Sequence, residues 1–202
     1  MRQCDSKLKL LQTAHELIWR QSYGSVGVDQ ICEHSGVKKG SFYHFFRSKS
    51  DLAVAAYEYH WQELREKLDV VFSKDKPPLQ RLDDYFRHIS DRQRERLERF
   101  GRMLGCPFVS LGSELSTQDE SVRQMAQKIS ANKCKYFEET LRDAIAEGVI
   151  EPTDPAVLAR ELHFYLVGLV QEAKIANDLR ALNGMRAGAY RLLGVRAAAL
   201  VS

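Results

Sequence analysis

Residues 28–46, VDQICEHSGVKKGSFYHFF, predict two short helices joined by a tight turn. Apolar residues recur at helical spacing in both halves: Val28, Ile31 and Cys32 in the first, and Phe42, Phe45 and Phe46 in the second. Gly36 lies between the two sets, where the end of a helix often requires the positive φ that glycine tolerates. This arrangement indicates a helix-turn-helix.

The second helix of the motif carries basic and hydroxyl groups that a hydrophobic core does not need. These groups are Lys38, Lys39, Ser41, Tyr43 and His44. In helix-turn-helix proteins the N-terminal residues of the second helix face base edges in the major groove, while nearby hydroxyls and cations bind phosphates. The segment therefore predicts binding to double-stranded DNA.

The run GVKKGSFYHFFRSKSDL, residues 36–52, preceded by YGSVGVDQI at 23–31, resembles the signature of the TetR/AcrR family of bacterial transcriptional regulators. The resemblance covers residues 1–64 and implies an all-α fold. A three-helix helix-turn-helix DNA-binding domain at 4–64, with its motif at 27–46, would be joined by a long fourth helix to an all-helical ligand-binding and dimerisation domain at 65–202.

Two positions depart from the family pattern. Gly27 stands where the family usually has a Ser or Thr cap, and Cys32 where it commonly has Ala. Glycine is a tolerated N-cap whose N–H can still meet a phosphate, and a buried thiol packs as a small hydrophobe. Neither departure argues against the fold.

The motif and the resemblance together assign the DNA contacts. The predicted DNA-binding residues are Gly27, Lys38, Lys39, Gly40, Ser41, Tyr43, His44 and Lys49. We expect Lys38 and Lys39 to contact bases or adjacent phosphates, and Tyr43 and His44 to contact phosphate oxygens. Lys49 is expected to contact the DNA backbone from the start of the fourth helix.

Charge is unevenly spread over the 202 residues, whose net charge is only +3. Residues 1–50 hold eight Lys and Arg against four Asp and Glu, so the remaining 152 residues carry a net charge of −1. On a helix-turn-helix this asymmetry is the expected footprint for phosphate. The 44% apolar content is that of an ordinary globular protein.

Several other function classes are disfavoured. The four cysteines, Cys4, Cys32, Cys106 and Cys134, show no CxxC spacing, which argues against a disulfide scaffold or a zinc ribbon. The charged N-terminus is unlike a signal peptide, and no run approaches the ~20 apolar residues of a membrane span. We therefore predict a cytoplasmic protein. No paired nucleophile and base, metal-ligand cluster or phosphate-binding loop predicts an enzyme, a cofactor or a metal.

Helical patterns continue along the chain, with no strand pattern. We expect helices at 6–21, 49–72, 79–98, 120–147, 154–177 and 182–193, with Ser48 capping the second of these. The charged run DRQRERLER at 91–99 is interpreted as a solvated helix face rather than a second nucleic-acid site. Gly101, Gly105, Pro107 and Gly112 predict a short, interrupted helix over 101–114.

The helix at 154–177 is apolar on more than one side. Leu158, Leu162, Tyr165 and Leu169 form one stripe, which Leu166, Val167 and Val170 widen. One side can face the domain and another a partner. The family resemblance likewise implies a homodimer through the last two helices, and a symmetric operator would mirror its two-fold axis.

The resemblance also implies a pocket for a small-molecule effector among the middle helices. The candidate lining residues are Phe100, Met103, Cys106, Phe108, Phe137, His163 and Phe164, with Tyr136 and Tyr165 beside them. The alternative for each is core packing, because aromatic residues at helical spacing are more often core. His163, in an apolar stretch, needs a hydrogen-bond partner that is either a ligand or another side chain.

Cys106 suggests a second mode of sensing. It lies one turn after Arg102 in a Gly-Cys-Pro kink, where a guanidinium and a broken helix end would lower the thiol pKa. The sequence thus predicts a DNA-binding regulator, with repression favoured because a bound dimer excludes polymerase, released by a small molecule or an electrophile. The alternatives are a thiol-sensing regulator acting through Cys106 and a helical assembly module without DNA binding.

Overall fold

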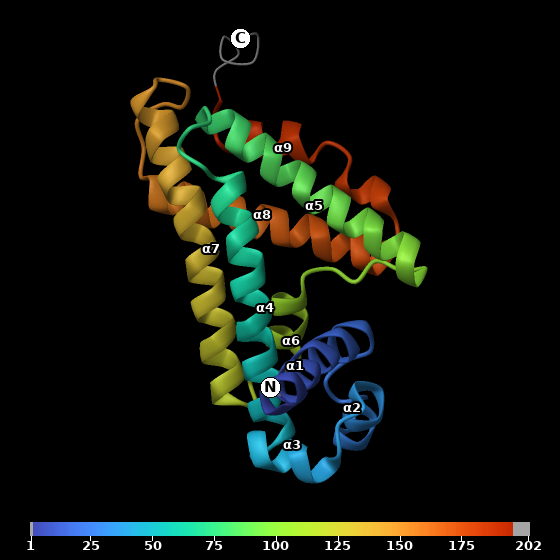
Figure 1. The fold of residues 1–202 in the computed structure, drawn as a ribbon. Helices are drawn as coiled ribbons and strands as arrows, with labels where there is room; N and C mark the ends of the chain where they lie inside the picture. The colour runs from blue at the N-terminus through green and yellow to red at the C-terminus, as the bar shows by residue number, and fades with distance from the viewer. Residues whose placement is uncertain (1, 196–202) are drawn as a thin grey trace. The chain divides into compact units, whose positions relative to one another are not determined.

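A computed structural model describes residues 2–195, and over this range every regular element is helical (Figure 1). The elements are α1 (Arg2–Arg20), α2 (Val28–Ser35), α3 (Lys39–Phe45), α4 (Lys49–Val71), α5 (Pro78–Phe100), α6 (Pro107–Leu115), α7 (Glu120–Ala146), α8 (Pro155–Ala176), the 3-10 helix η1 (Leu179–Leu182) and α9 (Met185–Leu192). The predicted all-α fold is confirmed. Within the described range, no helix has both the length and the apolar character needed to cross a bilayer.

Local chemistry sets most of the helix ends. The Ser48 hydroxyl accepts the Asp51 N–H at 3.0 Å, which confirms Ser48 as the cap of α4. Gly36 ends α2 with a φ of 66°, as predicted. The last predicted helix, at 182–193, is present as α9 but begins only at Met185, because Gly184 adopts a φ of 77° and separates α9 from η1.

The chain forms two compact units, and the first is discontinuous in sequence. It contains residues 2–66 and 107–129, whereas the second contains 67–106 and the described residues from 130 onward. The two compact units therefore do not coincide with the two predicted domains, which meet at one boundary after residue 64. The reason is the α6 residue Phe108, whose ring lies 6.0 Å from that of Tyr57 and 5.7 Å from that of His60, both on α4.

In the first unit, α1, α2 and α3 pack around a small apolar core (Figure 1). Its fully buried side chains include Leu10, Ala14, Ile31, Phe42 and Leu52. Because one side of α3 is fixed in this core by Phe42, the opposite side of that helix faces outward.

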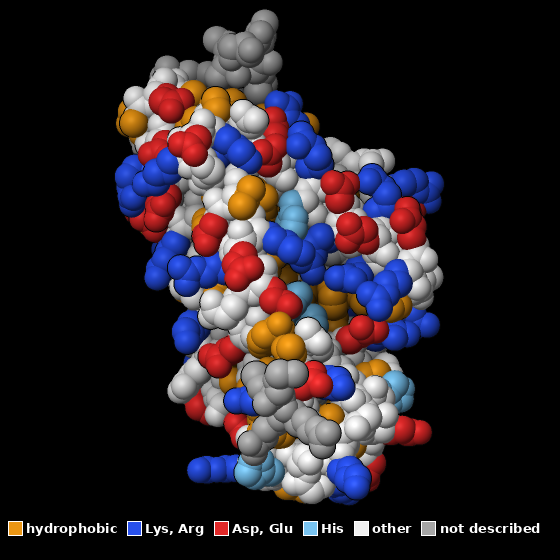
Figure 2. Space-filling view, viewed as in Figure 1, with side chains coloured by type: hydrophobic (Ala, Val, Ile, Leu, Met, Phe, Trp, Pro, Cys, Tyr) orange, Lys and Arg blue, Asp and Glu red, His pale blue; other side chains and the backbone are white. Residues whose placement is uncertain are grey.

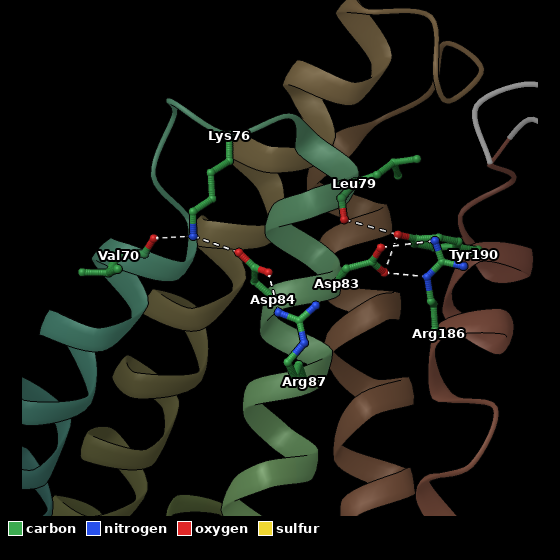
Figure 3. Close-up of polar contacts among 8 residues, drawn as sticks. All are labelled: Val70, Lys76, Leu79, Asp83, Asp84, Arg87, Arg186 and Tyr190. Carbon is green, nitrogen blue, oxygen red and sulfur yellow. Dashed lines mark hydrogen bonds and ion pairs between the residues drawn. The ribbon is translucent and has the colours of Figure 1, made fainter. Parts of the chain in front are cut away.

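In the second unit, α5 is fixed by ion pairs on several sides. The buried guanidinium of Arg81 lies 2.6 Å from the Asp143 carboxylate of α7. Figure 3 shows Asp83 accepting from Arg186 at 2.7 Å and from the Tyr190 hydroxyl at 2.8 Å, which joins α5 to α9. The solvated face predicted from the charged run at 91–99 does not include these pairs, because Arg81 and Asp83 lie before that run and their partners are distant in sequence.

Candidate nucleic-acid interface

The outer side of α3 presents the predicted DNA-binding groups. Phe42 and Phe46 are buried beneath it, while Tyr43 is 56% exposed. Lys38, Lys39, Gly40 and His44 are also exposed, and Ser41 is partly exposed. In Figure 2, basic and histidine side chains lie along the lower edge of the view, where Figure 1 shows α3.

Two glycines leave open space beside this surface. A Cβ atom added at Gly27 or at Gly40 would meet nothing within 4 Å. Gly27 is the N-cap of α2 and makes no side-chain cap, and Gly40 lies in the first turn of α3. Another backbone can therefore approach both positions closely.

Lys39 already has an anionic neighbour on the adjacent helix. Its Nζ atom lies 2.7 Å from the Asp29 carboxylate, and both side chains are exposed. The hydrogen bond to Asp29 raises the pKa of Lys39. A DNA phosphate that binds Lys39 would have to replace the Asp29 carboxylate as the partner of its ammonium group.

Lys49 does not have the environment expected for a phosphate-binding lysine. Its Nζ atom donates to the carbonyl oxygens of Tyr23 at 2.8 Å and Val26 at 2.9 Å. The ammonium also lies 3.9 Å from the centre of the Tyr23 ring, and desolvation by burial lowers the pKa of Lys49. Lys49 thus holds the turn between α1 and α2 from a partly exposed position, and its contact with the DNA backbone stays a prediction.

Several members of the predicted effector set lie in the second unit. Met103, Phe137 and His163 are buried there, and Cys106 is half-buried. The His163 Nε2 atom lies 3.0 Å from the Ser130 hydroxyl. Burial, assisted by the nearby Lys133 ammonium, lowers the pKa of His163 to about 4, so this imidazole is neutral at pH 7.

Other members of that set lie elsewhere. Phe108 belongs to the first unit, with Tyr57 and His60 as ring neighbours. Phe164 is 64% exposed on α8, and the partly exposed ring of Phe100 lies under the Arg99 guanidinium at 4.7 Å. We therefore leave Phe100, Phe108 and Phe164 out of the candidate effector site, because a site in the second unit requires buried side chains from that unit.

The segment before Cys106 is fixed by polar residues that were not predicted from the sequence. The buried Gln93 amide exchanges two hydrogen bonds of 3.3 Å with the backbone of Gly105, and the Asn177 side chain accepts the Met103 N–H at 2.8 Å. Gly105 has a φ of 71°, and a Cβ there would lie 2.9 Å from Lys174. Gly105 indicates an irregular backbone already in the sequence, whereas nothing in the sequence marks the side-chain amides of Gln93 and Asn177 as its supports.

The same core contains Tyr85 and His88 from α5, which were also missed. The Tyr85 ring lies 5.2 Å from that of Phe137 and 6.3 Å from that of His88. Burial lowers the pKa of His88 to about 4. The second unit thus contains two neutral imidazoles beside an aromatic core.

An open groove of about 590 Å³ lies between α5 and the segment formed by η1 and α9, away from the predicted effector residues. Three arginines that line it are already paired: Arg87 with Asp84 at 3.0 Å, Arg94 with Asp91 at 2.9 Å and Arg186 with Asp83 at 2.7 Å (Figure 3 shows the first and last pairs). Because these charges are compensated, we do not assign the effector to this groove.

Two family models match separate parts of the chain. Residues 10–56 match the model of bacterial regulatory proteins of the tetR family, and residues 78–189 match the tetracyclin repressor-like C-terminal domain. The chain belongs to the TetR family. The second match alone covers more than half of this TetR-family chain.

Named relatives and solved structures agree with the TetR assignment. The transcriptional regulator AcuR of Cereibacter sphaeroides is 30% identical over 82% of this chain and 75% of its own length. A crystallised TetR regulatory protein from Rhodobacter sphaeroides has 28% identity and a TM-score of 0.80, covering 92% of this chain and 97% of that one. The transcriptional repressor NemR of Escherichia coli is 23% identical over 96% of both chains. The crystal structure of its reduced form has 24% identity and a TM-score of 0.83, covering 96% of this chain and 99% of that one.

Members of the TetR family are DNA-binding transcriptional regulators that bind operators and dimerise. The predicted family and the predicted DNA-binding regulatory function are thus confirmed for this chain. The outward side of α3 is the place on the described surface where the predicted contacts gather.

Proposed function

We propose that this TetR-family protein is a cytoplasmic repressor that binds an operator as a homodimer and is released by an effector bound in its second unit. The observation that carries the proposal is the exposed side of α3, where Lys38, Lys39, Tyr43 and His44 surround a glycine over a buried aromatic base. On this proposal Lys38, Lys39, Gly40 and Ser41 face the major groove.

Phosphate contacts would flank the recognition helix. Tyr43 and His44 reach phosphate oxygens from α3, and the open N-terminus of α2 at Gly27 offers backbone N–H groups to another phosphate. These contacts fix the register of the protein on the duplex, while the lysines read bases. Lys49 contributes indirectly by holding the turn before α2.

Repression follows if the bound dimer covers a promoter. The test is transcription in vitro from the promoter upstream of the protein's own gene, with purified protein titrated at constant polymerase concentration. Transcript yield should fall as the operator becomes occupied. A rise in transcript yield would identify an activator. An unchanged yield on a template that the protein occupies would contradict both repression and activation.

The surface of α8 supports a dimer through the last two helices. Val157, Phe164 and Ile175 are 37%, 64% and 71% exposed. Their separations of seven and eleven residues put them on one face of the helix. A face with three large exposed apolar side chains is a surface that a second copy can cover. Two recognition helices placed by such a dimer would lie about 34 to 36 Å apart on DNA.

The effector site is proposed around His163. The His163 imidazole and the Phe137 ring, whose centres lie 6.3 Å apart, would form one wall of the site, and Lys133, which already lies 3.6 Å from the Cys106 sulfur, would donate to a ligand oxygen. This lining suits a small compound with an apolar body and one hydrogen-bond acceptor. A compound that releases the operator should itself bind more weakly to the operator complex, by the same factor.

Thiol sensing at Cys106 is a second candidate mode, favoured by one contact. The Lys133 Nζ atom lies 3.6 Å from the Cys106 sulfur, so a cation other than the expected Arg102 is next to a half-buried thiol. Cys134 is a weaker candidate, because desolvation by burial raises the pKa of its thiol.

The two modes are separated by alkylation. N-ethylmaleimide should dissociate the operator complex of the wild type and leave that of a Cys106→Ser variant intact, with modification at Cys106 verified by mass spectrometry. Equal release of both complexes, or release of neither, would show that this thiol only packs. Non-covalent release by a small molecule would then remain the mode to test.

A further inference from the structure

The α6 residue Glu114 reaches the turn that precedes the helix-turn-helix. Its Oε2 atom accepts the Tyr23 N–H at 2.9 Å, and its Oε1 atom accepts the Gly24 N–H at 2.8 Å. Both carboxylate oxygens are thus used on consecutive amides of the α1–α2 turn, about 90 residues away in sequence. A carboxylate that accepts two backbone N–H groups makes stronger hydrogen bonds than a neutral acceptor.

The other side of the same turn is held by Lys49. That ammonium donates to the carbonyls of Tyr23 and Val26, so an anion binds the amides of the turn while a cation binds its carbonyls. The turn also contains a hydrogen bond of 2.8 Å between Ser22 and Ser25. Its geometry is therefore set by α6 and α4 as well as by its own residues.

The start of α2 depends on this turn. Its N-cap, Gly27, makes no side-chain cap, so nothing at the N-terminus of α2 fixes the incoming chain in the usual way. Val26, immediately before the cap, is fully buried and joins the turn to the core. A change in the turn is consequently transmitted to α2 and to the α3 helix that packs on it.

The loop that follows α6 is attached to α4 as well. The Ser50 hydroxyl hydrogen-bonds the Asp119 carboxylate, and Asp119 also accepts the backbone N–H groups of Ser121 and Val122 at 3.0 and 3.1 Å. Glu114 therefore lies in the last turn of a helix whose following loop is fixed to the same α4 that carries Lys49. The carboxylate has a defined position from which to hold the turn.

We propose that Glu114 is a positioning residue for operator recognition: it orients the helix-turn-helix from α6 without touching DNA. A purely structural role would lower stability, and it would affect specific and non-specific binding together. A positioning role predicts a selective loss of operator binding, because base contacts need the correct orientation of α3 whereas non-specific binding needs only its cations.

The test compares Glu114→Ala and Glu114→Gln with the control Ser113→Ala, an exposed neighbour on α6. Glu114→Ala should weaken operator binding about tenfold, equivalent to about 1.4 kcal/mol, with non-specific binding changed less than about twofold. Glu114→Gln keeps one acceptor and should fall between the wild type and Glu114→Ala. Ser113→Ala should bind like the wild type.

Amide exchange gives a local readout of the same contact. The Tyr23 and Gly24 N–H groups should exchange faster in both Glu114 variants, while the core amide of Ile31 keeps its protection. The double variant Glu114→Ala/Lys49→Met should lose less operator affinity than the sum of the single losses, because both residues hold one turn.

Three results would overturn the proposal. The first is wild-type operator affinity in Glu114→Ala. The second is an equal loss of operator and non-specific binding with reduced helical content in both Glu114 variants, which would indicate a structural role alone. The third is strict additivity with Lys49→Met, which would show that the two residues act on different features.

Discussion

The Nζ atom of Lys49 lies 2.8 Å from the carbonyl oxygen of Tyr23 and 3.9 Å from the centre of its ring. A lysine in the position where the sequence suggested a DNA contact is thus directed at the protein's own backbone. Its contribution to operator binding should therefore be geometric and not electrostatic.

Replacing Lys49 with Met separates these two contributions. Operator affinity should fall because the α1–α2 turn loses two hydrogen bonds, but the slope of log affinity against log salt should stay at its wild-type value. By contrast, Lys38→Gln removes an exposed cation and should reduce the magnitude of that slope by about one unit. Fluorescence anisotropy at four salt concentrations measures both slopes. If the slope for Lys49→Met falls by one unit instead, Lys49 contacts a phosphate directly.

Gly40→Ala should separate folding from DNA binding. A methyl group at Gly40 meets no protein atom, and alanine favours helix, so the free energy of unfolding should stay the same or rise by up to about 1 kcal/mol. Operator binding should nevertheless weaken, because the methyl group points into the space that the DNA backbone or base edges would occupy. Chemical denaturation and operator titration report the two quantities.

Gly36→Ala is the matched control for that experiment, because the same substitution at this glycine should affect folding stability. Gly36 has a φ of 66°, so alanine there should lower the free energy of unfolding by about 1 kcal/mol. Stable Gly40→Ala protein with unchanged operator affinity would remove Gly40 from the interface.

The helix pattern was largely predictable from the sequence because it depends on local chemistry. Gly36, Ser48 and the spacing of Phe42 and Phe46 each act within one turn of helix, and the structure places them as expected. The partners of Lys49 and Glu114 depend on residues 23 to 91 positions away. No local spacing encodes such contacts, so the positions of α3 and its basic groups were predictable while the support of the α1–α2 turn was not.

A charge on the exposed apolar face of α8 should leave each subunit folded but prevent two subunits from associating. Phe164→Asp and Ile175→Asp each put a carboxylate on the exposed apolar face, so sedimentation should show folded monomers with weakened operator binding. Val70→Asp is the control, because Val70 is 68% exposed on α4 and should leave the dimer intact. Dimers in both α8 variants would place the interface elsewhere.

Leu166 shows why the side of α8 could not be assigned from its sequence. It belongs to the apolar set that was predicted to include a partner face, yet only 4% of it is exposed and it packs inside its own unit. A helix that is apolar on two sides has no period that distinguishes the core from an interface. Leu166→Asp should therefore unfold the second unit instead of producing a folded monomer.

His163 should make the stability of the protein depend on pH. Burial, aided by Lys133, lowers its folded-state pKa from 6.5 to about 4, so between these values the unfolded chain binds a proton that the folded chain does not. The free energy of unfolding should thus decrease as the pH falls from 6.5 toward 4 and should be insensitive to this group above 6.5. In urea titrations, the loss between pH 7.5 and 4.5 should be about 2 kcal/mol larger for the wild type than for His163→Gln. Equal losses in the two proteins would mean that folding does not lower the pKa of His163.

The central claim, that the exposed side of α3 reads the operator, is tested most directly by the affinity of Tyr43→Phe for a DNA fragment from upstream of the gene. Tyr43 is 56% exposed, so removing its hydroxyl should leave the melting temperature unchanged. The wild type should prefer this fragment to unrelated DNA of the same length. The variant should bind the fragment about tenfold more weakly at every salt concentration, because one hydrogen bond to a charged phosphate is lost. Equal affinity of the two proteins, or a wild type without preference for the fragment, would contradict the account.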